Sequence, residues 1–149
     1  MPTPKIALVV LALLSVGCAA LSGSREQYFV CSYDNVWDAA LETMKGQSVS
    51  SFDKEKGLIE TSWQDVPPTS ERSFGIFGNN ERARMTVSVK RMDDVASVSV
   101  LETRQRWHSR GGVTQQALKW WPVDPSEDAT NGVVDRLNAK LKAKGCAPT

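Results

Sequence analysis

The sequence predicts an α+β domain in which an antiparallel sheet packs against a long C-terminal helix, with elements in the order β-α-β-β-β-β-α. Apolar residues recur every three or four positions in residues 36–44 and 133–141, as on one face of a helix. Apolar and polar residues alternate in residues 85–90 and 97–100, as in strands with one buried face. Short turn signals separate consecutive strand segments, which favours a meander.

The first strand is expected at residues 27–31, and the first helix follows directly. Ser32 or Asp34 can cap its start, and Gly46 ends it. The spacing of the apolar residues places Trp37 on the face that points to the core.

A hairpin of strands 48–54 and 57–64 comes next, joined by a turn at residues 53–57. Three residues of its second strand are expected on one side: Ile59, Thr61 and Trp63. Trp63 is therefore assigned to the core together with Trp37. Longer strands at 82–92 and 95–107 complete the meander.

Two long loops, 66–80 and 109–123, lie after the hairpin and after the last strand. A capping signature then follows, with Asp124 as N-cap, Pro125 at the first helical position and Glu127 at the third. It predicts a helix of roughly 20 residues that ends at Gly145. This order of elements is that of a helix-grip domain, in which the sheet wraps around the C-terminal helix.

The first 17 residues have the pattern of an export signal. Lys5 precedes an apolar run at residues 6–16, and small residues precede Cys18. The run is too short to span a bilayer, which needs ~20 residues. We therefore divide the chain into a signal peptide at 1–17, a tether at 18–26 and a domain at 27–149.

The end of the signal resembles the bacterial lipobox. The resemblance implies that Cys18 becomes the first mature residue and carries the lipid, and a plain secretory signal cut nearby is the alternative. Ala19 follows the cysteine, where an aspartate would indicate retention in the inner membrane. The expected location is the periplasmic face of the outer membrane, with the lipid as the membrane contact.

Charge and cysteine content narrow the function further. The chain has 18 basic and 17 acidic residues, which does not suggest a nucleic-acid partner. With Cys18 lipidated, the two remaining cysteines are Cys31 and Cys146. Because the exported compartment is oxidising and both residues map to one end of the sheet, we expect a disulfide between them.

Three segments resemble a known family: VWDAAL at 36–41, DKEKG at 53–57 and LIETSW at 58–63. They are similar to the helix and the G-x-I-E-T-x-W hairpin of BamC (NlpB)-like outer-membrane lipoproteins, over about residues 27–145. The resemblance implies a helix-grip fold and an accessory role beside the machine that folds outer-membrane β-barrels. That family carries two such domains and a long unstructured segment after the lipid, whereas this sequence predicts one domain and about eight tether residues.

The sequence offers little for catalysis, and we expect neither an enzyme, a cofactor nor a metal site. His108 has no neighbouring His, Cys or carboxylate at metal-ligand spacing. Glu102 directly follows an apolar stretch and could act as an acid in a pocket, but a solvated strand end is the favoured interpretation.

Aromatic and basic residues in the long loops predict an interaction surface. Alternate connections of a meander share one end of the sheet, so the two loops are expected to be neighbours. Aromatic residues and arginine are enriched in interface cores. The surface comprises Arg72, Phe74, Ile76, Phe77, Trp107, Arg110, Lys119, Trp120 and Trp121, with Arg82 at its rim. The alternative is that the loops bury their own aromatic side chains.

These observations favour a lipid-anchored binding or accessory module that assists outer-membrane protein or envelope assembly through contact with an envelope protein. The first strand is expected to start at the loop end, which would hold the interaction surface near the bilayer. The alternative is a carrier of a small apolar ligand between sheet and helix, in a cavity of ~300 Å³ or more. That cavity would lie where Val87, Val89, Val98 and Val100 face Val133 and Leu137.

Overall fold

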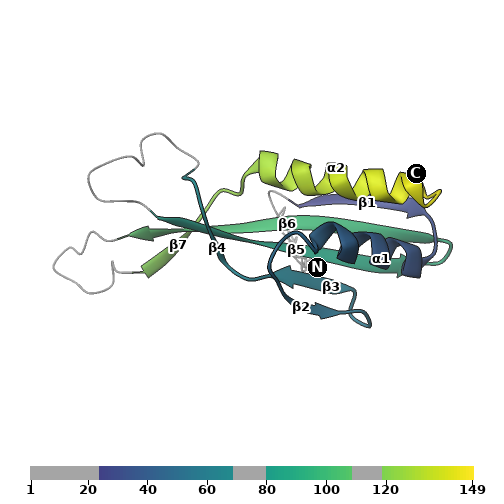
Figure 1. Ribbon diagram of the computed structural model, residues 1–149, viewed down its shortest axis with the longest axis horizontal. Coiled ribbons are helices and arrows are strands. Elements are labelled where there is room, and N and C mark those ends of the chain that lie inside the picture. Colours follow the sequence, from purple (N-terminus) through teal and green to yellow (C-terminus); the bar gives the residue numbers. More distant parts are fainter. Residues whose placement is uncertain (1–23, 69–79, 109–118) are drawn as a thin grey trace, which may run out of the picture.

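The computed structural model describes residues 24–68, 80–108 and 119–149. Within these residues the chain forms two helices and one antiparallel sheet of eight strands (Figure 1). In chain order the elements are β1 (Arg25–Val30), α1 (Tyr33–Met44), β2 (Val49–Asp53), β3 (Leu58–Thr61), β4 (Gln64–Val66), β5 (Glu81–Met92), β6 (Val95–His108), β7 (Lys119–Val123), α2 (Glu127–Ala143) and β8 (Ala147–Pro148). The predicted α+β class and the long C-terminal helix are confirmed.

The long hairpin of β5 and β6 is the centre of the sheet. Its two strands pair without a break in register from Glu81 opposite Arg106 to Met92 opposite Val95. β3 and β2 continue the sheet beyond β5, and β1 and β8 continue it beyond β6. The order of the predicted meander is therefore confirmed, with β1 added beside its last strand.

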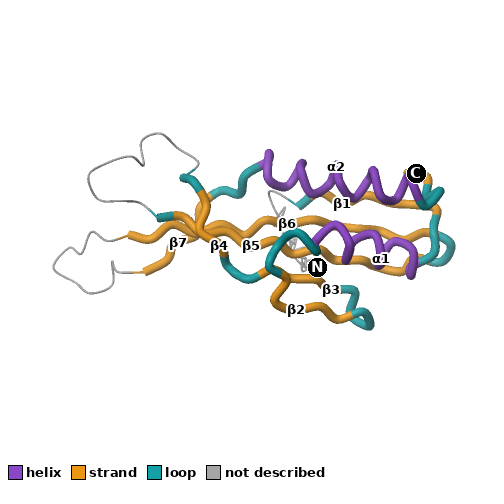
Figure 2. The backbone as a smooth tube through the Cα atoms, in the orientation of Figure 1, coloured by secondary structure: helices purple, strands orange, loops and turns teal. Residues whose placement is uncertain are grey.

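Both helices pack on the same face of this sheet, side by side (Figure 2). The buried side chains of β5 and β6 alternate along each strand, as at Val87 and Val89 or Val98 and Val100. Trp37 of α1 is 3% exposed, as predicted. The core consists of Phe29, Val36, Trp37, Ala39, Ala40, Met44, Ile59, Met85, Val87, Val89, Ala96, Val98, Val100, Val133, Val134, Leu137, Leu141 and Cys146.

Half of the β5–β6 hairpin projects beyond the two helices, and the short strands β4 and β7 flank it (Figure 1). Residues 119–123 were predicted as loop, and the structure corrects this prediction, because β7 pairs with residues 104–108 of β6. Pro122 lacks a backbone donor, yet β7 pairs only with β6, and an outer strand tolerates proline. Large aromatic side chains at Trp120 and Trp121 also suit a strand.

The first strand starts farther from the projecting end than predicted. β1 points its N-terminus in the expected direction, but its register places Arg25 opposite Val100. Trp107 lies seven residues farther along β6, about 23 Å away at the rise of a strand. The physical reason is that β7 already occupies the side of β6 at residues 104–108.

The helix caps agree with the prediction at α1 and differ at α2. Ser32 caps α1, and its hydroxyl oxygen accepts a hydrogen bond from the Asn35 N–H at 3.3 Å. The cap of α2 is Ser126 rather than Asp124, so the helix has 17 residues instead of roughly 20. A tertiary contact accounts for this shift, since the Ser126 N–H donates to the Glu102 carboxylate at 3.4 Å.

Trp63 does not lie in the core, which corrects the prediction for this residue. Between Glu60 opposite Thr86 and Gln64 opposite Ala83, the register shifts by one residue. Because side chains alternate along a strand, one extra residue reverses the face on which the following side chains lie. Trp63 is therefore on the face opposite the helices, although Ile59 and Thr61 are buried beneath them.

The predicted pairing of Cys31 with Cys146 is confirmed. Their sulfur atoms lie 2.00 Å apart, and their Cα atoms lie 5.2 Å apart. Cys31 follows β1 and Cys146 precedes β8, two strands that pair with each other. The bond thus joins the two ends of the described domain across 115 residues of chain.

Gly57→Ala is expected to reduce the stability of the domain more than Gly145→Ala. Both glycines have a positive φ, of 66° and 77°, so each alanine introduces backbone strain of ~1–3 kcal/mol. An added Cβ at Gly57 would also lie 1.9 Å from the carbonyl oxygen of Val89, whereas at Gly145 it meets nothing within 4 Å. Urea unfolding should therefore show an additional loss of at least ~2 kcal/mol for Gly57→Ala. Equal losses would contradict the close approach of the β2–β3 turn to β5.

Candidate functional site

Four charged residues meet on the helix-bearing face of the hairpin, beside the start of α2. This charge network consists of Glu81, Glu102, Arg104 and Arg106. Glu81, Glu102 and Arg104 are only 1%, 2% and 6% exposed. Because a buried charge is costly unless it is paired, the contacts among these groups decide whether this part of the fold is stable.

The network joins two glutamates through two arginines. Arg104 donates from Nε to Glu102 Oε1 at 2.6 Å and from Nη1 to Glu81 Oε2 at 2.9 Å. Arg106 donates from Nε and Nη2 to Glu81 Oε1, at 2.9 and 2.6 Å. Burial lowers the pKa of Arg104, but its hydrogen bonds to Glu102 and Glu81 outweigh this effect and raise that pKa above its ordinary value. The guanidinium therefore stays charged.

A hollow of about 390 Å³ lies beside this network. Glu102 and Arg104 line it from β6, and the first half of α2 forms the opposite wall with Asp128, Gly132 and Arg136. Such a volume falls within the range of small-molecule sites. Oε2 of Glu102 is buried and accepts no hydrogen bond from the described part of the chain.

The favoured interpretation of Glu102 as a solvated strand end was wrong. Glu102 lies on the same face of β6 as Val98 and Val100, and the pairing of β6 with β5 continues past it. The sequence carried a signal for this, because the alternation of buried positions extends beyond the apolar stretch. Arg104 occupies the next position on that face, and its ion pair with Glu102 compensates for the cost of burying the carboxylate.

The opposite face of the projecting half carries a cluster of tryptophan and arginine side chains. This Trp–Arg stack comprises Trp63, Arg82, Arg84, Trp107 and Trp120. The Arg82 guanidinium carbon lies 4.5 Å from the Trp63 ring centroid and 4.1 Å from that of Trp120. Arg82 also donates two hydrogen bonds to Gln105 Oε1, at 3.0 and 2.8 Å. The guanidinium is thus held between two indole rings.

The structure brings together only some of the predicted interaction residues. Trp107 and Trp120 are partly buried, and their ring centroids lie 5.5 Å apart. Trp121 is 42% exposed and projects with Lys119 from the other side of β7, where the Lys119 Nζ lies 4.1 Å from its ring centroid. The other predicted residues lie outside the described residues: Cys18, Arg72, Phe74, Ile76, Phe77 and Arg110.

The prediction that the two long loops are neighbours falls mainly on residues 69–79 and 109–118, which lie outside the described residues. The last residue of the first loop lies against β6, because the Trp107 N–H donates to the Asn80 carbonyl at 2.8 Å. Sequence reasoning missed Trp63 and Arg84 as members of the stack. The one-residue shift of register at 62–63 moved Trp63 to this face, and nothing in the sequence pattern marks that shift.

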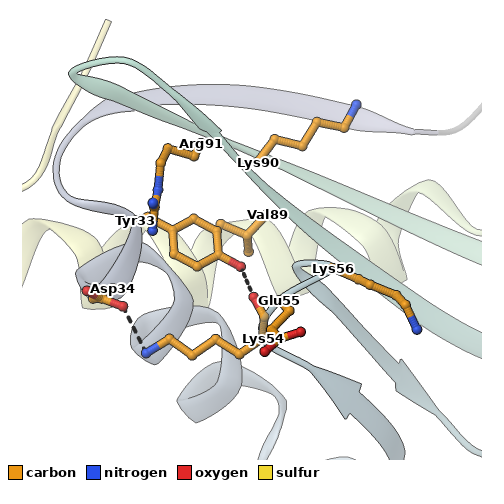
Figure 3. Close-up of a pocket in the computed structure, with 8 residues that line it drawn as sticks. All are labelled: Tyr33, Asp34, Lys54, Glu55, Lys56, Val89, Lys90 and Arg91. Atoms are coloured by element: carbon orange, nitrogen blue, oxygen red, sulfur yellow. Dashed lines mark hydrogen bonds and ion pairs between the residues drawn. The ribbon is translucent and has the colours of Figure 1, made fainter.

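A larger surface groove, of about 790 Å³, lies between the start of α1, the β2–β3 turn and β5 (Figure 3). The Tyr33 hydroxyl donates to the Lys54 carbonyl at 2.5 Å, and Lys54 pairs with Asp34 at 2.8 Å. The hydrogen bond from Lys54 lowers the pKa of Asp34, and burial raises the pKa of Tyr33. Arg91 covers the Tyr33 ring at 4.9 Å. These contacts join the walls to each other, so the groove is best explained by the packing of the turn against α1.

No protein-family model matches the chain, and no curated protein is significantly similar to it. Among the described residues, no group of three or more His, Cys, Asp or Glu side chains is arranged to hold a metal ion. Neither of the two described helices is long and apolar enough to cross a membrane.

Arg104→Met is expected to destabilise the fold by ~3–5 kcal/mol, because Glu81 and Glu102 would lose the cation that they share. Urea unfolding at neutral pH should show this loss, and Arg136→Met, at an exposed position, should change stability by less than ~0.5 kcal/mol. Glu81 keeps Arg106, but Glu102 would become a buried carboxylate without a cation, and protonation removes that cost. Lowering the pH should therefore reduce the loss of stability caused by Arg104→Met. A deficit that does not depend on pH would contradict this explanation.

Proposed function

We propose that this protein is a lipid-anchored binding or accessory module of the bacterial outer membrane, attached through Cys18 on the periplasmic side. It assists outer-membrane protein or envelope assembly by contacting an envelope protein through the Trp–Arg stack. The fold would be of the helix-grip class, with the family resemblance to BamC-like lipoproteins at residues 36–41 and 53–63. The observation that carries the proposal is the stack itself, on the sheet face away from both helices.

The composition of the stack supports a protein contact. Tryptophan and arginine are the residues most enriched among those that contribute most to binding at protein interfaces. An arginine side chain is costly to immobilise on binding, and here Arg82 is already fixed by two indole rings and by Gln105. The arginines Arg82 and Arg84 also give this face positive charge, which favours a partner with acidic groups.

The alternative of an apolar-ligand carrier stays a prediction. The six side chains expected around its cavity are each buried to 2% exposure or less. They are Val87, Val89, Val98, Val100, Val133 and Leu137. They are shared by the core cluster that joins the sheet to both helices, and a core position needs no ligand to explain it.

Lipidation at Cys18 is tested by mass spectrometry of the protein extracted from membranes. The expected result is a mature chain that starts at Cys18 and carries two or three acyl chains on that residue. Cys18→Ser should leave the domain folded but release it from the membrane fraction. A mature chain that starts elsewhere with a free Cys18 would contradict the anchoring.

The contact through the Trp–Arg stack is tested by photocrosslinking in intact membranes. A photoreactive phenylalanine at Thr103, which pairs with Arg84 on the stack face, should give a discrete protein adduct. The same group at Asp135, exposed on α2, is the control and should not give that adduct. Arg82→Ala should weaken the contact by about 30-fold or more if Arg82 is a principal binding residue.

The melting temperature of each variant separates loss of binding from loss of fold. Arg82→Ala with the adduct lost and the melting temperature within a few degrees supports the proposal. Equal adducts from positions 103 and 135, or an adduct that Arg82→Ala leaves unchanged, would show that the stack only holds the hairpin together.

A further inference from the structure

The hollow beside the charge network has the features of a ligand site, and it is separate from the Trp–Arg stack. It opens on the helix-bearing side of the sheet, between β6 and the first half of α2. The stack lies on the other side of the sheet, and Arg84 is the one residue that the stack and the lining of the hollow share. We propose that this hollow binds a small zwitterion, with an ammonium group at Glu102 and a carboxylate at Arg136.

Glu102 provides the acceptor at the floor of the hollow. Its side chain is 1% exposed, and its Oε1 accepts hydrogen bonds from Arg104 at 2.6 Å and from the Ser126 N–H at 3.4 Å. Its Oε2 is buried and has no donor among the described residues. A buried carboxylate oxygen without a donor is costly, and a ligand ammonium that reaches it would recover this cost.

The charges around the hollow favour a ligand that carries both signs. On the sheet side of the hollow, Glu102 is acidic and Arg84 and Arg104 are basic, so these groups do not favour a purely cationic ligand. On α2, Asp128 and Arg136 add one charge of each sign to the wall. Arg136 is exposed and forms no ion pair with another described residue, which leaves its guanidinium available to a carboxylate. Arg84 also lines the hollow, but its guanidinium lies over the Trp63 ring.

Gly132 is the second observation that points to a ligand. It lies between Asp128 and Arg136 on the face of α2 that lines the hollow, where positions four apart are neighbours. Glycine is unfavourable in a helix interior, yet an added Cβ would meet only Arg136 Nη1, at an ordinary contact distance of 3.7 Å. Packing within the chain therefore does not require a glycine here. Its effect is to keep the wall of the hollow free of a side chain.

The volume sets the size of the ligand. About 390 Å³ is at the lower end of the range for small-molecule sites, which suits an amino acid or a dipeptide. The wall of α2 from Asp128 to Arg136 spans eight residues, about 12 Å at the rise of a helix. A ligand whose opposite charges are separated by one or two residues fits this span.

The test titrates the full chain in detergent with glycylglycine and follows backbone amide shifts by NMR. Binding should move the resonances of Ser126, Ala129 and Gly132, with saturation at millimolar concentration. N-acetylglycylglycine, which lacks the ammonium, and glycylglycinamide, which lacks the carboxylate, are the matched probes. Each should bind at least ten-fold more weakly than glycylglycine.

Variants assign the two contacts. Glu102→Gln should reduce the affinity for glycylglycine at least ten-fold, and Arg136→Gln should do the same while leaving the affinity for glycylglycinamide unchanged. Gly132→Leu keeps every charged group but places a bulky side chain on the wall of the hollow, beside Arg136. It should abolish binding with the melting temperature unchanged or raised, so this result stands even if Glu102→Gln folds poorly.

Two results would overturn the proposal. One is the absence of saturable shifts at these residues with glycylglycine at tens of millimolar. The other is equal binding of the acetylated probe, which would show that no ammonium reaches Glu102. Neither result bears on the Trp–Arg stack, whose photocrosslinking test uses different residues and a different readout.

Discussion

The unbroken pairing of β5 with β6 is the constraint on which the rest of the structure depends. It runs from Glu81 opposite Arg106 to Met92 opposite Val95, and side chains alternate between the two faces along its whole length. One face therefore carries the valines beneath the helices and, farther along, the charge network. The other carries Arg82, Arg84 and Trp107. If one strand slipped by one residue, its side chains would exchange faces, and arginines without ion-pair partners would lie beneath α2. Burial and charge together therefore fix the register.

The charge network marks the point where the apolar core ends and α2 begins. Glu102 accepts a hydrogen bond from the backbone of Ser126, which places the start of the helix at a defined position on the sheet. A negative charge at this end also suits the helix dipole. Hydrophobic side chains of the same volume could hold the same strands, often with no loss of stability. Hydrophobic side chains could not, however, offer a hydrogen-bond acceptor to the hollow. The use of charged residues at these positions is therefore informative about function.

Local patterns in the sequence were sufficient for most of the fold and for little of the site. Alternation predicted β5 and β6, and helical spacing predicted both helices. The expectation that Cys18 is lipidated left two cysteines, which predicted the pairing of Cys31 with Cys146. The errors arose where tertiary contacts override local signals. Ser126 caps α2 because Glu102 holds its backbone, and Trp63 changed faces because of a one-residue shift in register. The hollow could not be predicted, because its walls come from strands and a helix that are far apart in the sequence.

The projecting half of the hairpin lacks the apolar core that supports the other half, so other interactions must hold its strands. On one face these are charge-assisted hydrogen bonds, each contributing ~1.5–3 kcal/mol, and on the other they are cation–π contacts of ~0.5–2 kcal/mol. The residues of the Trp–Arg stack are thus structural and also available for recognition, since they stay partly exposed, whereas Glu81, Glu102 and Arg104 are almost fully buried. Binding and stability are therefore coupled in this region. A substitution that removes a charged group changes both, whereas filling the space beside Gly132 changes binding while retaining every pair that holds the strands.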